Sequence, residues 1–462
     1  MDQELGLTLI ILFLLVLKVW DGIKENGSII RIANILLVLL FVSGFVCQGE
    51  GQLFSGMFLS SKLISLEKSI LLFGTIIISL QSQQWLQKHK HLPEFFILLL
   101  TTLLGMFFMI SSGNILMFYL GLELSTIPLA ALANFDLEKG RSSEAAMKMI
   151  MSSAFSSGIL LFGISLLYGT TGSLDFNEIA THLNGNSLQM LAFIFILSGV
   201  AFKISAVPFH LWTADVYEGA PVAITAYLSV ISKGAIVFAF ASFLYRVVPS
   251  LEGTWYNVLM ILAVLSMTIG NIFAMRQNNI KRFLAFSSIA QAGYILLGIS
   301  GGSQMGMTSS VYFILIYICS NLAAFGVISL IASANGKEDI NDYKGLYKSN
   351  PALALIMMLA LFSLAGIPPT AGFFGKLFLI TAGAAKQNYI FLTIAALNMI
   401  VSLYYYLRVV KAMVVDENEN PMEEFKTGMS EKIALIICTA GIILIGFISN
   451  LFEYIYSLSF GM

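Results

Sequence analysis

Long apolar stretches recur along the whole chain, and they restrict its fold more than any other feature. A helix needs about 20 mostly apolar residues to cross the roughly 30 Å of hydrocarbon in a bilayer, where all backbone polar groups must be paired within the protein. The sequence therefore predicts an all-α polytopic membrane protein with about 14 transmembrane helices. The fourteen segments are approximately 5–20, 28–47, 62–81, 93–111, 113–132, 145–168, 188–216, 221–245, 256–275, 281–300, 308–333, 351–384, 388–411 and 432–458.

Composition excludes several other classes of protein. Hydrophobic residues make up 58% of the chain and charged residues 11%, which rules out both a water-soluble globule and a disordered chain. A net charge of -1 makes nucleic acid an unexpected partner. The four histidines and the single cysteines Cys47, Cys319 and Cys438 are scattered, so we expect no metal site, no cofactor-binding site and no redox centre in this chain.

The basic residues predict the orientation of the helices. Connections that are rich in Lys and Arg stay in the cytoplasm. Sixteen of these residues fall in the odd-numbered connections or at their edges, whereas the even-numbered ones hold only Lys62, Arg246 and Lys386. Both termini are therefore expected outside. The first segment opens with Asp2 and Glu4 instead of basic residues, so it is expected to remain as helix 1.

Two of the predicted spans are too long and carry helix breakers. Pro208 cannot donate a helical hydrogen bond, so span 7 should break just past Lys203. Span 12 is interrupted at mid-depth by residues 366–372, with two prolines and two glycines. In transporters such broken helices mark the ion path, although a kink that serves only packing is the alternative.

The two breaks lie five spans apart, and five is an odd number. A second five-helix unit would therefore be inserted upside down relative to the first, so helices 4–8 and 9–13 are predicted to be inverted repeats, each with a broken helix (7 and 12). This divides the chain into an N-terminal unit (1–92), a first repeat (93–245), a second repeat (256–411) and a C-terminal loop and helix (412–462).

Four charged residues lie deep in apolar segments, where a charge is expensive and usually functional. They are Glu123, Lys203, Lys233 and Lys376. A desolvated lysine can release its proton, which an arginine cannot do, and a nearby carboxylate favours the charged form. This row predicts proton transfer through the middle of the membrane, with H⁺ as the transported ion. A structural ion pair at Glu123 and snorkelling lysines are the alternatives.

Three further residues are candidates for a proton relay. Lys148 lies nearer the cytoplasmic end of span 6, Lys281 begins span 10, and His210 follows the first break. A histidine titrates near neutral pH, but one between aromatic residues is commonly a packing residue. Lys68, which lies beside Glu67 near one end of span 3, is expected to have no special role.

Several motifs then resemble one known family. They are 202–221 (FKISAVPFHLWTADVYEGAP), 121–129 (GLELSTIPL), 280–282 (IKR), 287–290 (SSIA) and 363–376 (SLAGIPPTAGFFGK), and they span helices 4 to 13 in order. The chain resembles the antiporter-like subunit N family of the bacterial proton-pumping NADH:quinone oxidoreductase, respiratory complex I. Subunits L and M and the large subunits of multi-subunit (Mrp-type) Na⁺/H⁺ antiporters share the fold, so an antiporter subunit is the alternative, and a purely structural membrane subunit is another.

The resemblance implies one proton channel, driven by quinone reduction elsewhere in the complex. It implies that Glu123 pairs with Lys203, that Lys233 is a connector, and that Lys376 communicates with the exit or the neighbouring subunit. FMN, Fe–S clusters and quinone are expected in or at partner subunits, with M and K types as neighbours in the bacterial inner membrane. Many relatives carry a His where Gln291 stands here, and glutamine cannot titrate.

Overall fold

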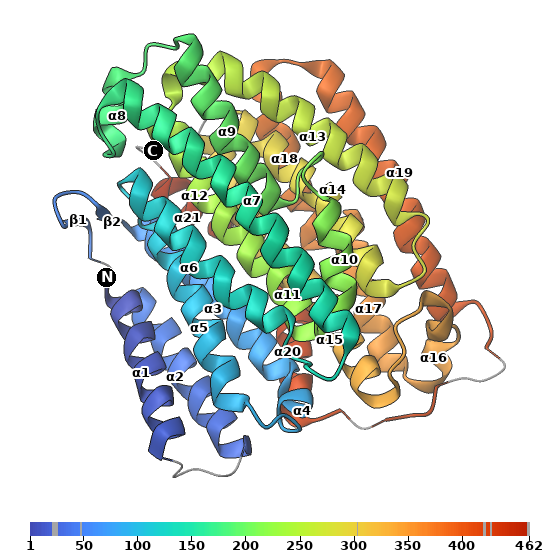
Figure 1. The fold of residues 1–462 in the computed structure, drawn as a ribbon. Helices are drawn as coiled ribbons and strands as arrows, with labels where there is room; N and C mark the ends of the chain where they lie inside the picture. Colours follow the sequence, from blue (N-terminus) through green and yellow to red (C-terminus); the bar gives the residue numbers. More distant parts are fainter. Residues whose placement is uncertain (21–25, 47–48, 303, 419–421, 426, 460–462) are drawn as a thin grey trace.

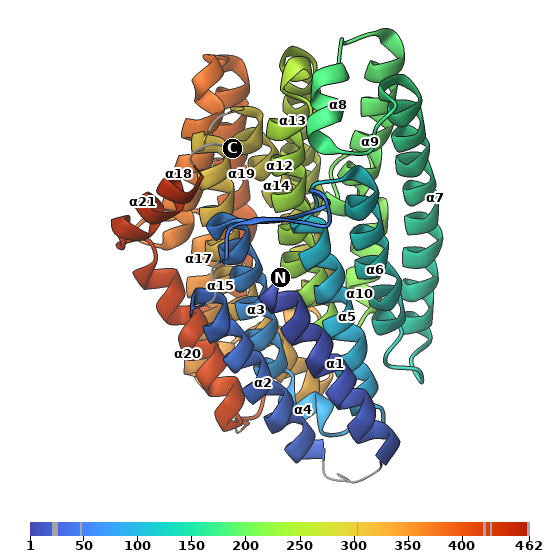
Figure 2. The ribbon, with the colours of Figure 1, turned by 90° about the vertical axis from the view of Figure 1, so that its left-hand side faces the viewer.

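The structure, a computed structural model, describes residues 1–20, 26–46, 49–302, 304–418, 422–425 and 427–459 (Figure 1). Cys47 lies outside the described residues, as do Lys24 and Lys426, two of the sixteen basic residues used to predict the orientation. Long helices run side by side through the molecule and are joined by short connections (Figures 1 and 2). The protein is all-helical apart from one small hairpin in the described part of the chain, as the apolar segments predict.

The elements follow one another along the chain in this order: α1 (Asp2–Trp20), α2 (Asn26–Val46), β1 (Gly51–Leu53), β2 (Phe58–Ser60), α3 (Lys62–Gln81), α4 (Gln83–Leu86), α5 (Leu92–Ile110), α6 (Ile115–Ala133), α7 (Gly140–Thr171), α8 (Phe176–His182), α9 (Ser187–Ile204), α10 (Leu211–Gly219), α11 (Val222–Tyr227), the π-helix η1 (Leu228–Ser232), α12 (Lys233–Arg246), η2 (Pro249–Leu251), α13 (Glu252–Ala274), α14 (Ile280–Ser300), α15 (Gln304–Asn335), η3 (Ile340–Tyr343), α16 (Leu346–Ser349), α17 (Pro351–Ala365), α18 (Ala371–Gly383), η4 (Ala384–Lys386), α19 (Tyr389–Val414), α20 (Met429–Leu444) and α21 (Ser449–Leu458).

A helix or a helix pair lies over each of the fourteen predicted segments. Among the described residues, 12 helices are long and apolar enough to cross a membrane by themselves. The pair α20 and α21, bent by 86°, brings this to as many as 13. The remaining segment is divided between α17 and α18, of which α17 is apolar but short. The count of fourteen spans and the inverted relation between the two halves stay predictions.

Both predicted helix breaks are present. Helix α9 ends at Ile204, and Ser205 follows in the left-handed region with φ 66°. Pro208 lies in the turn before α10, where its missing N–H disrupts no helical hydrogen bond. Helix α17 ends before Gly366, whose φ of 86° suits a residue without a side chain. The second break leaves the carbonyls of Leu364 and Ala365 available inside the bundle.

The connections gather at two opposite ends of the bundle. At one end, strand β1 pairs with β2, Phe58 bridges to Ser112, and Asn114 bridges to Asp175. We call this the hairpin end. At the other end, Trp85 of α4, Lys139 before α7, Lys281 in the first turn of α14 and Glu338 before η3 line one cavity. We call this the basic end.

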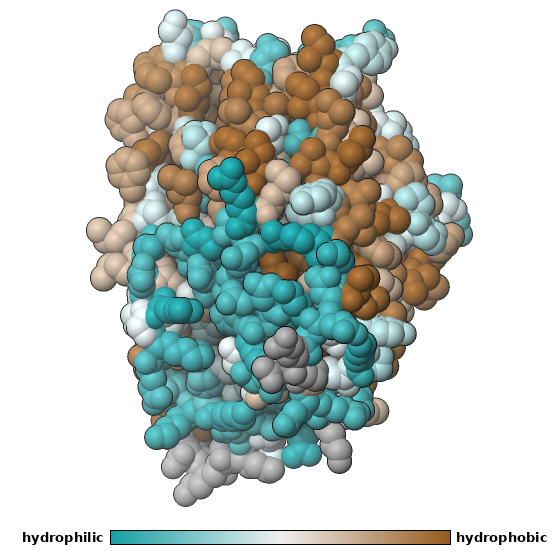
Figure 3. All heavy atoms as spheres, turned by 90° about the vertical axis from the view of Figure 1, so that its right-hand side faces the viewer, coloured by the Kyte–Doolittle hydropathy of each residue, from teal (hydrophilic) through white to brown (hydrophobic). Residues whose placement is uncertain are grey.

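Burial differs strongly among the helices. All of the apolar window of α14 is buried and 94% of that of α15, whereas only 28% is buried in α1 and in α19. The outer helices therefore expose apolar side chains of the kind that faces lipid or another subunit. Figure 3 shows hydrophilic residues gathered over the lower part of one face and mostly apolar residues above them. Helices α14 and α15 form the protected centre that positions the site.

Candidate functional site

Glu123 on α6 and Lys203 on α9 lie near each other but do not touch. Lys203 Nζ donates hydrogen bonds to Thr126 Oγ1 (2.8 Å) and Ser153 Oγ (2.6 Å). Thr126 lies three residues after Glu123, so the lysine reaches α6 one turn away from the carboxylate. Both residues are described, and no ion pair within 4.0 Å joins them; Oε1 of Glu123 is buried without a hydrogen-bond partner. Two hydroxyl groups therefore hold Lys203 beside an unpaired carboxylate.

The local sequence explains how α6 presents Glu123. A methyl group on Gly121 would lie 2.6 Å from the backbone nitrogen of Met109, so glycine allows α5 and α6 to pack closely. Pro128 lies inside α6 and lacks an N–H. The carbonyl of Leu124, four residues earlier, therefore has no helical donor from Pro128. The carbonyl of Leu124 therefore adds a polar group to α6 next to Glu123, where α5 packs closely.

Lys233 lies at the centre of the bundle, immediately after the π-helix η1. It is 3% exposed and donates a hydrogen bond to Ser288 Oγ on α14 at 2.8 Å. Its Nζ lies 5.7 Å from the ring centre of Tyr217, which is also buried. Within the described residues no carboxylate lies within 4.0 Å of this ammonium. Single π-helical turns are frequent at functional sites, because they turn side chains that a regular helix could not present.

Lys376 donates hydrogen bonds to the backbone at the second helix break. Its Nζ donates hydrogen bonds to the carbonyls of Leu364 (2.7 Å) and Ala365 (3.3 Å), the last two residues of α17. The final carbonyls of a helix lack helical donors and carry the negative end of the helix dipole, which favours a cation. The side chain is 1% exposed and lies 4.8 Å from the ring centre of Tyr294. The break therefore builds a cation site inside the bundle.

Gln291 and Lys376 donate hydrogen bonds to the same backbone carbonyl. Its Nε2 donates to Leu364 O (3.0 Å) and to the hydroxyl of Tyr406 (3.2 Å), while its Oε1 is buried without a partner. Tyr406 in turn shares a 2.5 Å hydrogen bond with Ser287. Tyr406 was not predicted from sequence, because a tyrosine in an apolar helix is usually a packing residue.

Helix α14 joins the two central lysines through adjacent serines. Ser288 accepts the hydrogen bond from Lys233, and Ser287 bonds to Tyr406 beside Gln291. Neighbouring residues on a helix point in directions about 100° apart, so the two hydroxyls serve different sides of α14. Two sets of hydrogen-bonded polar groups, one at Lys233 and one at Lys376, therefore meet at neighbouring residues of α14.

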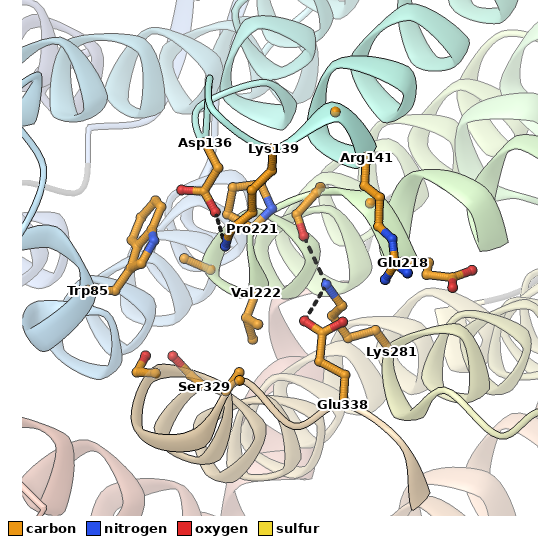
Figure 4. A pocket seen from close by; sticks show the side chains of 17 residues that line it. Trp85, Asp136, Lys139, Arg141, Glu218, Pro221, Val222, Lys281, Ser329 and Glu338 are labelled. Atoms are coloured by element: carbon orange, nitrogen blue, oxygen red, sulfur yellow. Dashed lines mark hydrogen bonds and ion pairs between the residues drawn. The ribbon is translucent and has the colours of Figure 1, made fainter.

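A polar cavity of about 470 Å³ opens at the basic end (Figure 4). Lys281 lies on its wall between two acceptors, Glu338 at 2.9 Å and the carbonyl of Ala220 at 3.3 Å. Its side chain is only 5% exposed. Lys281 and Ser288 are seven residues apart on α14, which places them on one face and about 10.5 Å apart along the helix. One face of α14 therefore leads from the cavity, at Lys281, to Ser288, which is bonded to Lys233.

Asp136 forms another part of the same cavity wall, in the connection between α6 and α7. Its two oxygens lie 3.3 Å from His89 Nε2 and 2.8 Å from Lys139 Nζ. Burial alone would raise the pKa of Asp136, but the hydrogen bonds from His89 and Lys139 outweigh it and lower the pKa to about 2. Asp136 is therefore a fixed negative charge at physiological pH.

Replacing Asp136 with Asn should lower the free energy of unfolding at pH 7 by about 2 kcal/mol, since one pKa unit corresponds to about 1.4 kcal/mol. Because the folded-state pKa is lowered, this contribution is complete above about pH 4 and disappears as the pH falls through about 2. Thermal unfolding in detergent should show the same deficit at pH 6 and pH 8. The control is Glu138→Gln, a change at an exposed carboxylate. A deficit in the free energy of unfolding that is present at one of these two pH values and absent at the other would contradict the assignment.

Lys148 lies outside the central row. It is 43% exposed and forms ion pairs of 2.8 Å with Glu144 and Asp215. Arg282 extends the network, at 2.6 Å from Asp215 and 2.9 Å from Glu218. The sequence placed Lys148 close to the cytoplasmic end of its span but could not identify Asp215 and Arg282, which come from α10 and α14.

His210 is buried at the start of α10, next to the first break. No hydrogen bond or ion pair in the described part of the chain joins it to Lys203 or Lys233. Its assignment as a relay stays a prediction. The expected absence of a metal also stays a prediction; within the described residues, no group of three or more His, Cys, Asp or Glu side chains is placed to hold a metal ion.

Comparisons with known proteins agree on one kind of membrane subunit. Residues 112–402 match the family "NADH:quinone oxidoreductase/Mrp antiporter, TM". NADH-quinone oxidoreductase subunit N of Phocaeicola vulgatus is 49% identical over 458 residues, covering 98% of this chain and 97% of that protein. A chain of respiratory complex I from Thermus thermophilus superposes with a TM-score of 0.84 at 28% identity, with 97% of both chains covered. A chain of the Mrp complex from Dietzia sp. DQ12-45-1b shares the fold, with a TM-score of 0.88 at 19% identity and coverage of 99% of this chain and 96% of that one.

Proposed function

Because the chain belongs to the NADH-quinone oxidoreductase subunit N family, we propose that it is a proton-translocating membrane-arm subunit of such an enzyme in a bacterial inner membrane. One observation carries the proposal: Lys203, Lys233 and Lys376 are each held by neutral oxygen acceptors on neighbouring elements, with Glu123 near Lys203. Lysines without a contacting counter-charge are costly in a membrane protein unless their charge is used.

In this proposal a proton enters from the cavity at the basic end. Lys281 lies on the cavity wall, and the face of α14 that carries it leads to Ser288 and Lys233. A proton that leaves Lys233 then passes along the hydroxyls of α14 and Tyr406 toward Lys376. Gln291 orients acceptors but cannot carry the proton itself, so hydroxyl groups and water take this step.

The pair of Glu123 and Lys203 is proposed to gate this transfer. Nothing holds the two groups in direct contact, so a small movement of α6 or α9 changes the distance between the charges. Quinone reduction elsewhere in the complex would supply that movement. Moving one charge against about 150 mV requires roughly 3.5 kcal/mol, and a charge interaction in a partly buried site is of this size.

The remaining expectations belong to the same proposal. Fourteen spans in two inverted repeats, helices 4–8 and 9–13, would place both termini outside and the basic end in the cytoplasm. The redox cofactors, FMN and Fe–S clusters, and the quinone would lie in or at other subunits, with M-type and K-type subunits as neighbours. The apolar outer faces of α1 and α19 offer the surfaces that lipid or such neighbours would cover.

The test is to find where the chain migrates. Native membranes are extracted in mild detergent, separated on a native gel and stained for NADH dehydrogenase activity, and the chain is located by mass spectrometry. Co-migration with an active assembly much larger than the 50.5 kDa chain is expected. Migration apart from that activity would contradict the proposal and favour an Mrp-type antiporter subunit, for which Na⁺/H⁺ exchange is the assay.

A further inference from the structure

A second group of buried charges lies outside the central row, between α1 and α3. Glu4, Glu67 and Lys68 are 1%, 2% and 2% exposed, respectively. Lys68 comes early in α3, where the sequence suggested a residue without a special role. The structure instead encloses it, and none of the steps proposed above uses these three residues.

Lys68 forms an ion pair with one carboxylate of this group. Its Nζ lies 2.5 Å from Glu4 Oε1 and 5.2 Å from the ring centre of Phe58. Phe58 belongs to strand β2, so the hairpin covers the ammonium from its own end of the bundle. The ring of Phe107, 6.0 Å away, closes another side. The pair of Lys68 and Glu4 is thus a shielded ion pair with aromatic neighbours.

Glu67 has no comparable partner. Its Oε1 is buried and makes no hydrogen bond in the described part of the chain. The other charged groups that face the cluster are the exposed Asp2 and the amino group of Met1, which lies 3.8 Å from Glu4. The buried part therefore holds two carboxyl groups and one ammonium. An unpaired ionised carboxylate in such surroundings is far more costly than a neutral carboxylic acid.

The hairpin end has space for water close to these charges, although none of the three residues lines it. A cavity of about 540 Å³ there is lined by Leu63, Ile64, Lys62 and Arg246, among others. Glu67 follows Leu63 by four residues and Ile64 by three, so it lies on the same face of α3 about one turn, or 5.4 Å, deeper. Figure 2 shows the hairpin as a strap at the upper ends of these N-terminal helices.

We propose that Glu67, with the Glu4–Lys68 pair beside it, forms a second proton-binding site that is separate from the central row and exchanges protons with the aqueous phase at the hairpin end. The ligand is a single proton, bound as the carboxylic acid of Glu67. The ion pair of Glu4 and Lys68 carries no net charge, so the three side chains together are neutral when Glu67 is protonated.

Infrared difference spectroscopy of the purified complex tests this site. The C=O stretch of a protonated carboxyl shifts in D₂O, and the wild type should show one such band that disappears in Glu67→Gln. Glu178→Gln, an exposed change near the hairpin end, should retain it. Lys233→Met should retain it as well, which separates this site from the central row. A band that persists unchanged in Glu67→Gln would overturn the proposal.

Assembly gives a second and independent measure. Glutamine has the shape of a neutral glutamic acid, so Glu67→Gln should reach an assembled yield within about twofold of the wild type. Glu4→Gln leaves the Lys68 ammonium buried without its partner, and the assembled yield should fall at least about tenfold. The opposite pattern, or a Glu67→Gln chain that fails to assemble, would show that Glu67 is ionised and contradict the assignment.

Discussion

Changing Lys233 to Met should reduce the rate of NADH-driven proton uptake by membrane vesicles to about a tenth of the wild-type rate or less. Lys233 is the central member of the row, and its ammonium is bonded to Ser288 on the helix that leads to both the cavity and Lys376. Without it, a proton must cross an apolar region with no carrier, and each 1.4 kcal/mol added to the barrier slows transfer about tenfold.

Assembly should survive this change. Methionine has nearly the length of lysine, fills the same space and removes a buried charge that has no contacting carboxylate. Lys148→Met is the matched control, because that lysine is 43% exposed and its ion pairs lie away from the row. Vesicles with the control variant should pump at close to the wild-type rate; equal losses in both variants would mean that Lys233 has no special place in transfer.

The second large effect concerns Glu123 and Lys203 together. Glu123→Gln and Lys203→Ala should each lower proton uptake about tenfold, because each removes one half of the proposed gate. If the two residues act as one unit, the double variant should lose no more than either single variant. Losses that multiply to about a hundredfold would show that the two residues act independently.

Glu123→Asp separates the effect of the carboxylate charge from the effect of side-chain shape. The shorter carboxylate keeps the charge but withdraws it by about one methylene from Lys203, which already lacks direct contact with Glu123. We expect Asp to restore part of the uptake that Gln loses, because the charge and not the fit is what the gate uses. Equal uptake in the Asp and Gln variants would contradict an electrostatic role.

The helices and their breaks could be predicted from sequence because they depend on local properties. Apolar runs of the right length mark helices. Pro208 and Gly366 mark where two of them are interrupted, because a proline cannot continue a helix without losing a hydrogen bond and Gly366 adopts a left-handed backbone. The depth of Lys233 and Lys376 within those runs also predicted that they are buried, and both are. These features need only the order of residues along one segment.

Partners on other helices could not be predicted, because they depend on how the helices pack. Lys148 and Lys233 both lie within apolar spans. Asp215 from α10 forms an ion pair with Lys148, whereas among the described residues no carboxylate lies within 4.0 Å of the Lys233 ammonium. Lys68 appeared to be an ordinary residue near a helix end until the structure placed Glu4 against it. The three-residue strands of the hairpin are too short to produce a pattern.

The proton-to-electron ratio is the most direct test of the account that this chain provides its own proton path. The assembled enzyme is reconstituted into liposomes, and protons moved per NADH oxidised are measured for the wild type, Lys203→Ala and Lys148→Met. The account predicts a lower ratio for Lys203→Ala and an unchanged ratio for Lys148→Met. An assembled Lys203→Ala enzyme that moves as many protons per NADH as the wild type would contradict it.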